Sequence, residues 1–290
     1  MRLAFLGDIH GNLPALESVL ADLEQQSPDA IYLLGDQVNR CGWDNEVMDL
    51  VADQGWPAIR GNHEWILGRL NTPDNPSALD NRVRFATLWW TWAQLSERHL
   101  ETIRALPAQR RLDFGIGPPI CLLHGTPDSP FVGLFPHDDE ITLASTLADI
   151  SEPIVVAAHT HWPMARKAGR WQIFNGGSVG MPYNGDPRGQ YLLLDLAVEK
   201  GTRCWKPTFR QAAYDRTCVQ NKFENLGLVA SIGRIAELHL RTVMDGEPWA
   251  SDFNHWVKSQ PAEIRDNPDR AVGLYLEKHG PDQWSFRSTA

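Results

Sequence analysis

Apolar runs and amphipathic stretches alternate regularly at the beginning of the chain. Residues 3–7 and 30–34 form short apolar runs, which are typical of buried strands. Apolar residues recur at helical spacing over 16–23 and again over 46–52, before a third apolar run at 57–60. This order predicts parallel strands of an α/β fold, because a parallel connection needs a crossover, usually a helix.

Residues 65–110 interrupt the alternation with a helical insertion. A loop rich in Pro and Asn precedes a helical stretch that we predict from about residue 79 to residue 106. Its aromatic residues Trp89, Trp90 and Trp92 are open to two interpretations, a binding surface or a packed core. Large apolar side chains are usually buried, so we expect these residues mainly to pack.

Strands return after the insertion, and the chain then becomes helical. The strands predicted here cover 120–123, 154–157, 171–174 and 191–196. Helical spacing of apolar residues begins near residue 208, so we divide the chain into a first domain, 1–207, and a mainly helical C-terminal extension, 208–290. The extension is a packing brace, an arm that joins two copies into a homo-oligomer, or a cap over a functional site. The sequence leaves these three open.

Side chains that can bind metal follow five of the predicted strands directly. The segments are Asp8-Ile9-His10, Gly35-Asp36, Asn62-His63, His124-Gly125 and His159-Thr160-His161. The carboxyl ends of parallel strands meet at one edge of a sheet, where α/β folds place ligands. Taken alone, each residue has a structural explanation, such as a helix N-cap or a turn. Five coincidences at strand ends instead favour one shared site.

The residue types in this set predict a site for two divalent metal ions. A ligand shared by two metals is best supplied by a carboxylate, so Asp8 and Asp36 are the candidates. The remaining donors are His10, Asn62, His124, His159 and His161. Mixed nitrogen and oxygen donors suit manganese, iron or zinc.

Composition and charge narrow the class of protein and of partner. The 290 residues contain 42% hydrophobic side chains, enough for a full core. The formal net charge of −9, without any basic stripe, argues against a long nucleic acid as partner. The four cysteines are too few for a disulfide framework, and we find neither a signal peptide nor an apolar run of about 20 residues. We therefore expect a cytoplasmic protein that does not contact a membrane.

In this order, the motifs resemble those of the calcineurin-like metallophosphoesterase superfamily. They are Gly-Asp-Ile-His-Gly at 7–11, Gly-Asp at 35–36, Gly-Asn-His-Glu at 61–64, His-Gly at 124–125 and His-Thr-His at 159–161. The resemblance covers about residues 1–196, and residues 174–180 look like the small bacterial phosphoesterases of that superfamily. It implies a four-layer fold in which two mixed β-sheets are flanked by helices, in place of a single parallel sheet.

The resemblance also implies roles for individual residues. For one metal the implied ligands are Asp8, His10, Asp36 and His161. For the other metal they are Asp36, Asn62, His124 and His159, which makes Asp36 the bridge and a catalytic residue. His63 matches a catalytic histidine that faces the substrate. We expect a nearby carboxylate to favour its protonated form, so that it protonates the leaving group.

Two features depart from the family pattern or match it only in part. Ala158 stands where a glycine usually precedes His-Thr-His, and residues 35–42 only partly resemble the corresponding run of protein phosphatases and diadenosine-tetraphosphate hydrolases. Within that run, Arg40 falls where those enzymes bind phosphate, although a loop arginine is often simply solvated. Arg40, Asn62 and His63 are the substrate-binding residues that the resemblance implies.

The implied activity is hydrolysis of phosphate mono- or diesters by a hydroxide that bridges two divalent transition metals, with manganese favoured over iron or zinc. The expected substrate is a phosphorylated small molecule or nucleotide, while dinucleoside polyphosphates and phosphoproteins stay open. A second interpretation is a catalytically silent scaffold of the same fold that binds protein partners. The presence of His63 beside the full set of ligands favours the enzyme.

Overall fold

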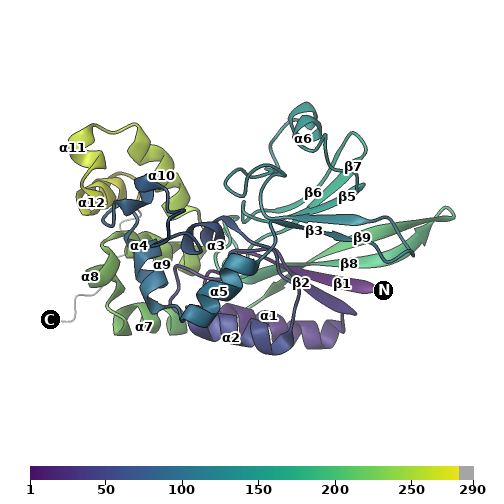
Figure 1. The fold of residues 1–290 in the computed structure, drawn as a ribbon, viewed down its shortest axis with the longest axis horizontal. Coiled ribbons are helices and arrows are strands. Elements are labelled where there is room, and N and C mark those ends of the chain that lie inside the picture. The colour runs from purple at the N-terminus through teal and green to yellow at the C-terminus, as the bar shows by residue number, and fades with distance from the viewer. Residues whose placement is uncertain (281–290) are drawn as a thin grey trace.

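Two β-sheets form the centre of the molecule (Figure 1). The computed structural model describes residues 1–280, and residues 281–290 of the expected extension lie outside the described residues. The first sheet has the order β2-β1-β8-β9, with strands Arg2–Leu6 (β1), Ala30–Leu33 (β2), Gly189–Glu199 (β8) and Thr202–Ala212 (β9). Strand β1 is parallel to β2 and antiparallel to β8, so this sheet is mixed.

The second sheet is mixed as well, which confirms the fold implied by the resemblance. Its order is β3-β4-β5-β7-β6, with strands Gln109–Leu112 (β3), Ile120–Leu123 (β4), Ile154–Ala157 (β5), Trp171–Gly176 (β7) and Pro163–Ala168 (β6). The central strands β4, β5 and β7 are parallel, and the edge strands β3 and β6 are antiparallel to their neighbours. The alternating pattern suggested a single parallel sheet, and that prediction is wrong. It is correct only for the parallel strand pairs β1–β2, β4–β5 and β5–β7.

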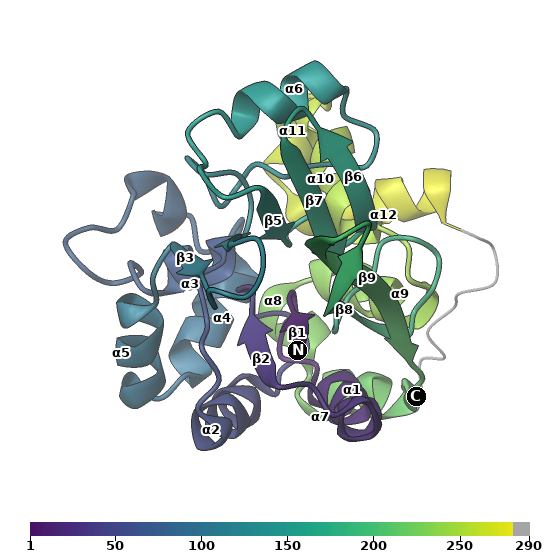
Figure 2. The same ribbon diagram turned by 90° about the vertical axis from the view of Figure 1, so that its right-hand side faces the viewer.

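The main core lies between the two sheets. Alternate residues of each strand point to opposite faces, so Leu3 and Phe5 of β1 meet Leu122 of β4 and Val156 of β5 in one buried cluster. The opposite face of the first sheet packs against helix α1, Leu13–Gln26. Helix α6, Glu140–Thr146, covers the outer face of the second sheet. The result is the sequence of layers helix, sheet, sheet, helix, and Figure 2 views these layers from the side.

The third predicted strand, at 57–60, is wrong as a strand. Only Ala58 forms a bridge, with Leu33 of β2, and the chain then turns into helix α3, Asn62–Leu67. Pro57 has no N–H to donate, and the N–H of Arg60 bonds to the carbonyl of Pro107 instead of to a neighbouring strand. The segment still brings Asn62 to the same edge as the end of β2.

The helical insertion is shorter and more broken than predicted. Helix α2, Asp44–Gln54, precedes the insertion. The helices after α3 are Ser77–Asp80 (η1, a 3₁₀ turn), Ala86–Gln94 (α4) and Glu97–Ala105 (α5). The chain is extended at Leu95, and Ser96 then caps α5 by accepting a hydrogen bond from the N–H of His99. Trp89 and Trp92 contact each other inside a local apolar cluster, as expected of packing residues.

The C-terminal helices pack against the two-sheet domain beside α3 and α4 (Figure 1). They are Thr217–Asn225 (α7), Leu228–Ile232 (α8), Ile235–Asp245 (α9), Trp249–Lys258 (α10), Ala262–Arg265 (α11) and Pro268–His279 (α12). Strand β9 runs to Ala212 and pairs with β8 along its full length, so the first sheet includes residues that we assigned to the extension. In residues 1–280, no helix combines the length and apolar character needed to cross a bilayer.

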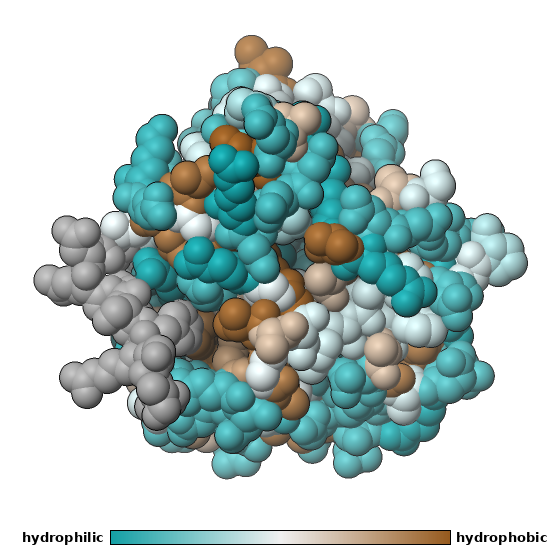
Figure 3. All heavy atoms as spheres, turned by 90° about the vertical axis from the view of Figure 1, so that its left-hand side faces the viewer, coloured by the Kyte–Doolittle hydropathy of each residue, from teal (hydrophilic) through white to brown (hydrophobic). Residues whose placement is uncertain are grey.

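The apolar face of α9 points inward, onto the loops of the first domain. Leu240 and Val243 share a buried cluster with Cys41 and Met181, which belong to loops at the ends of strands. Seen from the side of these helices, the periphery is mainly hydrophilic, and hydrophobic groups gather around a hollow near the centre (Figure 3). The extension is therefore built into the core of the molecule.

Leu240→Ala should test this integration. The side chain is 4% exposed, so its truncation should lower the free energy of unfolding by about 2–5 kcal/mol. Val229→Ala on α8, where the side chain is 44% exposed, is the control and should change it by less than about 0.5 kcal/mol. Urea unfolding followed by tryptophan fluorescence measures both. Small effects of both substitutions would show that α9 lies outside the cooperative core.

Candidate metal centre

The backbone of the strand-end loops turns the predicted ligands toward one another. Asp8, His10, Asp36, His159 and His161 all have a left-handed backbone, with φ between 53° and 67°. This conformation costs a residue with a Cβ roughly 1–2 kcal/mol, so the surrounding structure must hold it. Backbone hydrogen bonds do so: the N–H groups of Asp8 and His10 donate to the carbonyls of Gly35 and Asp36.

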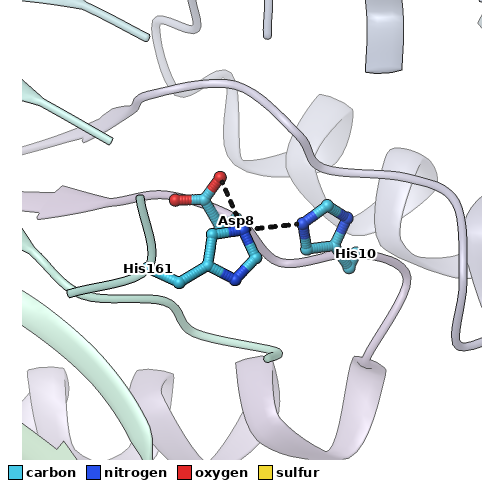
Figure 4. Close-up of side chains that lie close together, drawn as sticks. All are labelled: Asp8, His10 and His161. Carbon is cyan, nitrogen blue, oxygen red and sulfur yellow. Dashed lines mark hydrogen bonds and ion pairs between the residues drawn. The ribbon is translucent and has the colours of Figure 1, made fainter. Parts of the chain in front are cut away.

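The first cluster contains Asp8, His10 and His161 (Figure 4). His161 Nε2 lies 3.5 Å from Asp8 Oδ1 and 3.2 Å from His10 Nε2. The other ring nitrogen of His161, Nδ1, lies 2.5 Å from the carbonyl of Met181. A carbonyl only accepts, so Nδ1 carries the hydrogen and the Nε2 lone pair faces Asp8 and His10.

The second cluster contains Asp36, His124 and His159, with Asn62 between the two rings. Asn62 Oδ1 lies 3.0 Å from His124 Nε2 and 2.9 Å from His159 Nδ1. His124 Nδ1 donates to the carbonyl of Leu34 at 2.8 Å, which directs Nε2 at the cluster. Each of the seven side chains predicted from the sequence thus lies in one of two adjacent groups.

Asp36 lies between the two clusters. Its Oδ2 atom is 3.3 Å from His124 Nε2 in one cluster and 3.9 Å from His10 Nε2 in the other. Its Oδ1 atom accepts a hydrogen bond of 2.9 Å from the backbone N–H of His63. A single oxygen therefore faces both groups, while the second oxygen fixes the carboxylate in place.

Burial shapes the charges in these clusters. Desolvation raises the pKa of Asp8 well above its ordinary range and lowers the pKa values of His10 and His161 well below theirs. Burial also opposes charge on Asp36, but nearby histidines, His124 first, outweigh it and hold the pKa of Asp36 well below its usual range. In the same way, Asp36 overcomes burial at His124 and raises the pKa of that histidine to about 10.

Glu64 organises the second cluster, a role that our sequence analysis did not assign. Its buried carboxylate accepts hydrogen bonds from the N–H groups of Asp36 at 2.7 Å, Gln37 at 2.8 Å and Gly61 at 2.9 Å. These bonds tie the loop after β2 to the start of α3. The spacing was a usable signal, because a Glu three residues after a helix N-cap often bonds back to the cap N–H.

His63 and Arg40 lie beside the clusters, on the side that Asn39 covers. Asn39 Nδ2 is 2.5 Å from His63 Nδ1, and Asn39 Oδ1 accepts from Thr91 Oγ1 at 2.9 Å. The Thr91 hydroxyl thus orients the amide, so its NH₂ donates to Nδ1 and the His63 hydrogen sits on Nε2. Arg40 Nη2 lies 3.5 Å from this Nε2.

Burial opposes the protonated form that we expected for His63. Burial lowers the pKa of His63 to about 3, and the carboxylate of Asp36, 3.8 Å from Nε2, does not compensate. The sequence motifs could indicate that a carboxylate lies near His63. The loss of solvation of its ring, however, depends on all the segments that pack around it in the folded protein. His63 is a neutral hydrogen-bond donor.

The donors of this centre fit two divalent cations. Among the described residues, Asp8 Oδ1 is buried without a hydrogen-bond partner, a costly state that ligation of the carboxylate would relieve. The donor atoms of Asp8, His10 and His161 lie within 4.8 Å of one another, and so do those of Asp36, His124 and His159. Carboxylate oxygens and imidazole nitrogens together suit transition metals.

Comparison with known proteins agrees with this geometry. The profile of calcineurin-like phosphoesterases matches residues 1–203. The phosphodiesterase YfcE of Escherichia coli K12 is 30% identical over 201 residues, covering 68% of this chain and 89% of YfcE. The uncharacterised protein MJ0912 of Methanocaldococcus jannaschii is 24% identical over 211 residues, covering 67% of this chain and 82% of that protein.

Solved structures share the fold. A metallophosphoesterase from Sphaerobacter thermophilus superposes with a TM-score of 0.65 at 24% identity, covering 85% of this chain and 99% of that one. The hypothetical protein PH1004 from Pyrococcus horikoshii OT3 gives a TM-score of 0.68 at 22% identity, covering 81% and 97%. From its sequence profile over residues 1–203 and its relationship to YfcE, this chain belongs to the calcineurin-like phosphoesterase family.

Proposed function

We propose that this protein hydrolyses phosphate mono- or diesters with two divalent cations held at the strand ends. The observation that supports the proposal most directly is the position of Asp36, whose Oδ2 faces a histidine of each cluster. The relationship to YfcE supports a phosphodiester among the substrates. Manganese suits the mixed donors best, and the substrate would be a phosphorylated small molecule or nucleotide.

On this proposal each cluster holds one cation. The ligands of the first cation are Asp8, His10, His161 and Asp36. Those of the second are Asn62, His124, His159 and Asp36. When bound, two such cations acidify a shared water and supply Lewis acidity toward phosphoryl oxygens.

The chain itself would stabilise the charge that develops on the phosphoryl oxygens. His63 presents an N–H at Nε2, and the guanidinium of Arg40 lies beside it. Asn39 holds the His63 ring from behind, so these donors are oriented before the substrate arrives. Because burial lowers the pKa of His63, we infer that it contributes a hydrogen bond to the phosphoryl group in place of a proton to the leaving group.

The alternative of a silent scaffold is less well supported by this site. Buried polar atoms without partners, such as Asp8 Oδ1 and the Nε of Arg40, are destabilising unless a ligand occupies the site. A protein that only bound partners through its surface would gain nothing from them. A bound metal would occupy Asp8 Oδ1, and a bound phosphate would accept hydrogen bonds from Arg40.

Asp36→Asn should lower the affinity of both metal positions. The substitution removes the negative charge that faces both clusters, whereas His161→Ala removes one ligand of the first cluster alone. Titration of metal-free protein with Mn²⁺ in a calorimeter should therefore show two weakened sites in Asp36→Asn and one in His161→Ala. Equal behaviour of the two variants would refute the shared position of Asp36.

Metal uptake should release protons near neutral pH. The pKa of His124 is raised to about 10, so its Nε2 is protonated in the metal-free protein at pH 7 and must lose that proton to bind a cation. Apparent metal affinity should therefore rise with pH. Calorimetry at pH 7 in buffers of different ionisation enthalpy should detect release of at least about one proton. No release would mean that His124 is already neutral or binds no metal.

His63→Ala should retain metal and lose turnover. Loss of one preorganised donor to the phosphoryl oxygens should lower kcat by about 10² to 10³. An alkyl and a nitrophenyl phosphate ester should suffer similar losses, because a neutral His63 does not protonate the leaving group. Metal content and kcat are measured on the same preparation. A loss confined to the alkyl ester would instead assign His63 the role of a general acid.

A further inference from the structure

Helix α9 of the extension places a histidine in the interior. His239 is 4% exposed, and its Nδ1 atom is buried with no hydrogen-bond partner among residues 1–280. Burying an imidazole nitrogen in this way costs free energy unless something binds it. The position of His239 in the fold indicates which group would bind its Nδ1 atom.

The face of α9 that carries His239 packs on the loops of the metal centre. Ala236 lies three positions before His239 and Val243 four positions after it, so these three side chains share one face, and Leu240 lies on the adjoining side. The three apolar residues cluster with Cys41, which follows Arg40, and with Met181, whose carbonyl accepts from the ring of His161. His239 is therefore directed toward the part of the site formed by Arg40 and His63.

Electrostatics agree with this placement. Burial lowers the pKa of His239 well below its ordinary value, and the positive charge of Arg40 adds to that effect. This agrees with the packing of the α9 face against Cys41, the residue after Arg40.

The donors on this side are Arg40 and His63, and the nearest carboxylate, Asp36, has its Oδ2 3.8 Å from His63 Nε2. Among residues 1–280, Arg40 has no carboxylate within ion-pair distance, its Nε is buried without a partner, and its Nη2 is 3.5 Å from the N–H of His63. Arg40 also adopts a φ of 100°, which a side chain with a Cβ accepts only at a cost. A guanidinium held in this way, facing other donors, is arranged for an anion.

The extension is fixed firmly enough to keep His239 in place. The N–H of Gly185 donates to the carbonyl of Gly246, at the end of α9, over 3.0 Å. Gly185 lies in the loop that also carries Tyr183, whose ring stacks on His161 with centroids 4.1 Å apart. One loop therefore contacts both the first metal cluster and α9.

We propose that His239 is a substrate-binding residue, which donates a hydrogen bond from Nδ1 to a phosphoryl oxygen held by Arg40 and His63. The C-terminal extension is then one wall of the active site, and its ligand is the phosphoryl group of the ester and of the inorganic phosphate product. This inference rests on the proposed phosphoesterase function. It adds a residue from outside the 1–203 segment that matches the family profile.

The test uses full-length, metal-loaded protein and inorganic phosphate as the probe. His239→Leu keeps an apolar side chain of similar size without the N–H, and His239→Gln restores a donor. The exposed His255 on α10, as His255→Leu, is the matched control. His239→Leu should raise the phosphate inhibition constant and KM by about 10- to 100-fold, with a smaller change in kcat and unchanged metal content. His239→Gln should recover part of the loss, and His255→Leu should match the parent.

A second measurement does not depend on the variants folding. In Zn²⁺-loaded parent protein labelled with ¹⁵N at histidine, phosphate should shift the ring signals of His239, while those of His255 stay in place. An unmoved His239 signal, or phosphate binding within about twofold of the parent in folded His239→Leu, overturns the inference. Parent protein that binds phosphate but hydrolyses no ester would refute the proposed function instead, so the two failures are distinguishable.

Discussion

The carboxylate of Glu64 is the constraint on which the metal centre depends. It is fully buried and joins the backbone after β2 to the beginning of α3, so Asp36 and Asn62 cannot move independently. Burial raises the pKa of Glu64 to about 7 in the metal-free protein, with the nearby Asp36 charge contributing in the same direction. Cations in the two clusters would favour its ionised form, the form best suited to accept several N–H groups. Metal binding and the geometry of the ligand loops therefore reinforce each other.

The same argument extends to the stability of the whole centre. Left-handed residues, unpartnered buried atoms and a lone guanidinium are all destabilising in the absence of ligands. They persist because the two-sheet core and the C-terminal helices hold the loops from both sides. Ligands that bind only the folded chain return that stability by mass action. The rigid surroundings are therefore what allow the strained conformations to persist at the site.

Much of the site was predictable, and less of the fold. The proposed ligands Asp8 and His161 stand in short motifs, because metal chemistry restricts the residue types that can serve at each strand end. Strand pairing is less evident in the sequence. Strand β9 contains Pro207 and charged residues, and its pairing with β8 is decided by packing and not by the local sequence pattern. His239 sits in an ordinary amphipathic helix, so only the tertiary contacts of α9 distinguish it. The protonation of His63 likewise depends on burial by distant segments.

The strand order of the first sheet has a consequence for how the chain is made. Strand β1 pairs with β2, which follows it closely in the sequence. Its other partner, β8, begins only at Gly189 and pairs in turn with β9 in a hairpin. On a ribosome, the segment bearing Asp8 is therefore synthesised long before the strand that buries its other edge. Such non-local pairing folds slowly and leaves an unpaired strand edge exposed meanwhile. Until β8 has been synthesised and paired, the nascent chain therefore exposes one edge of β1 to aggregation.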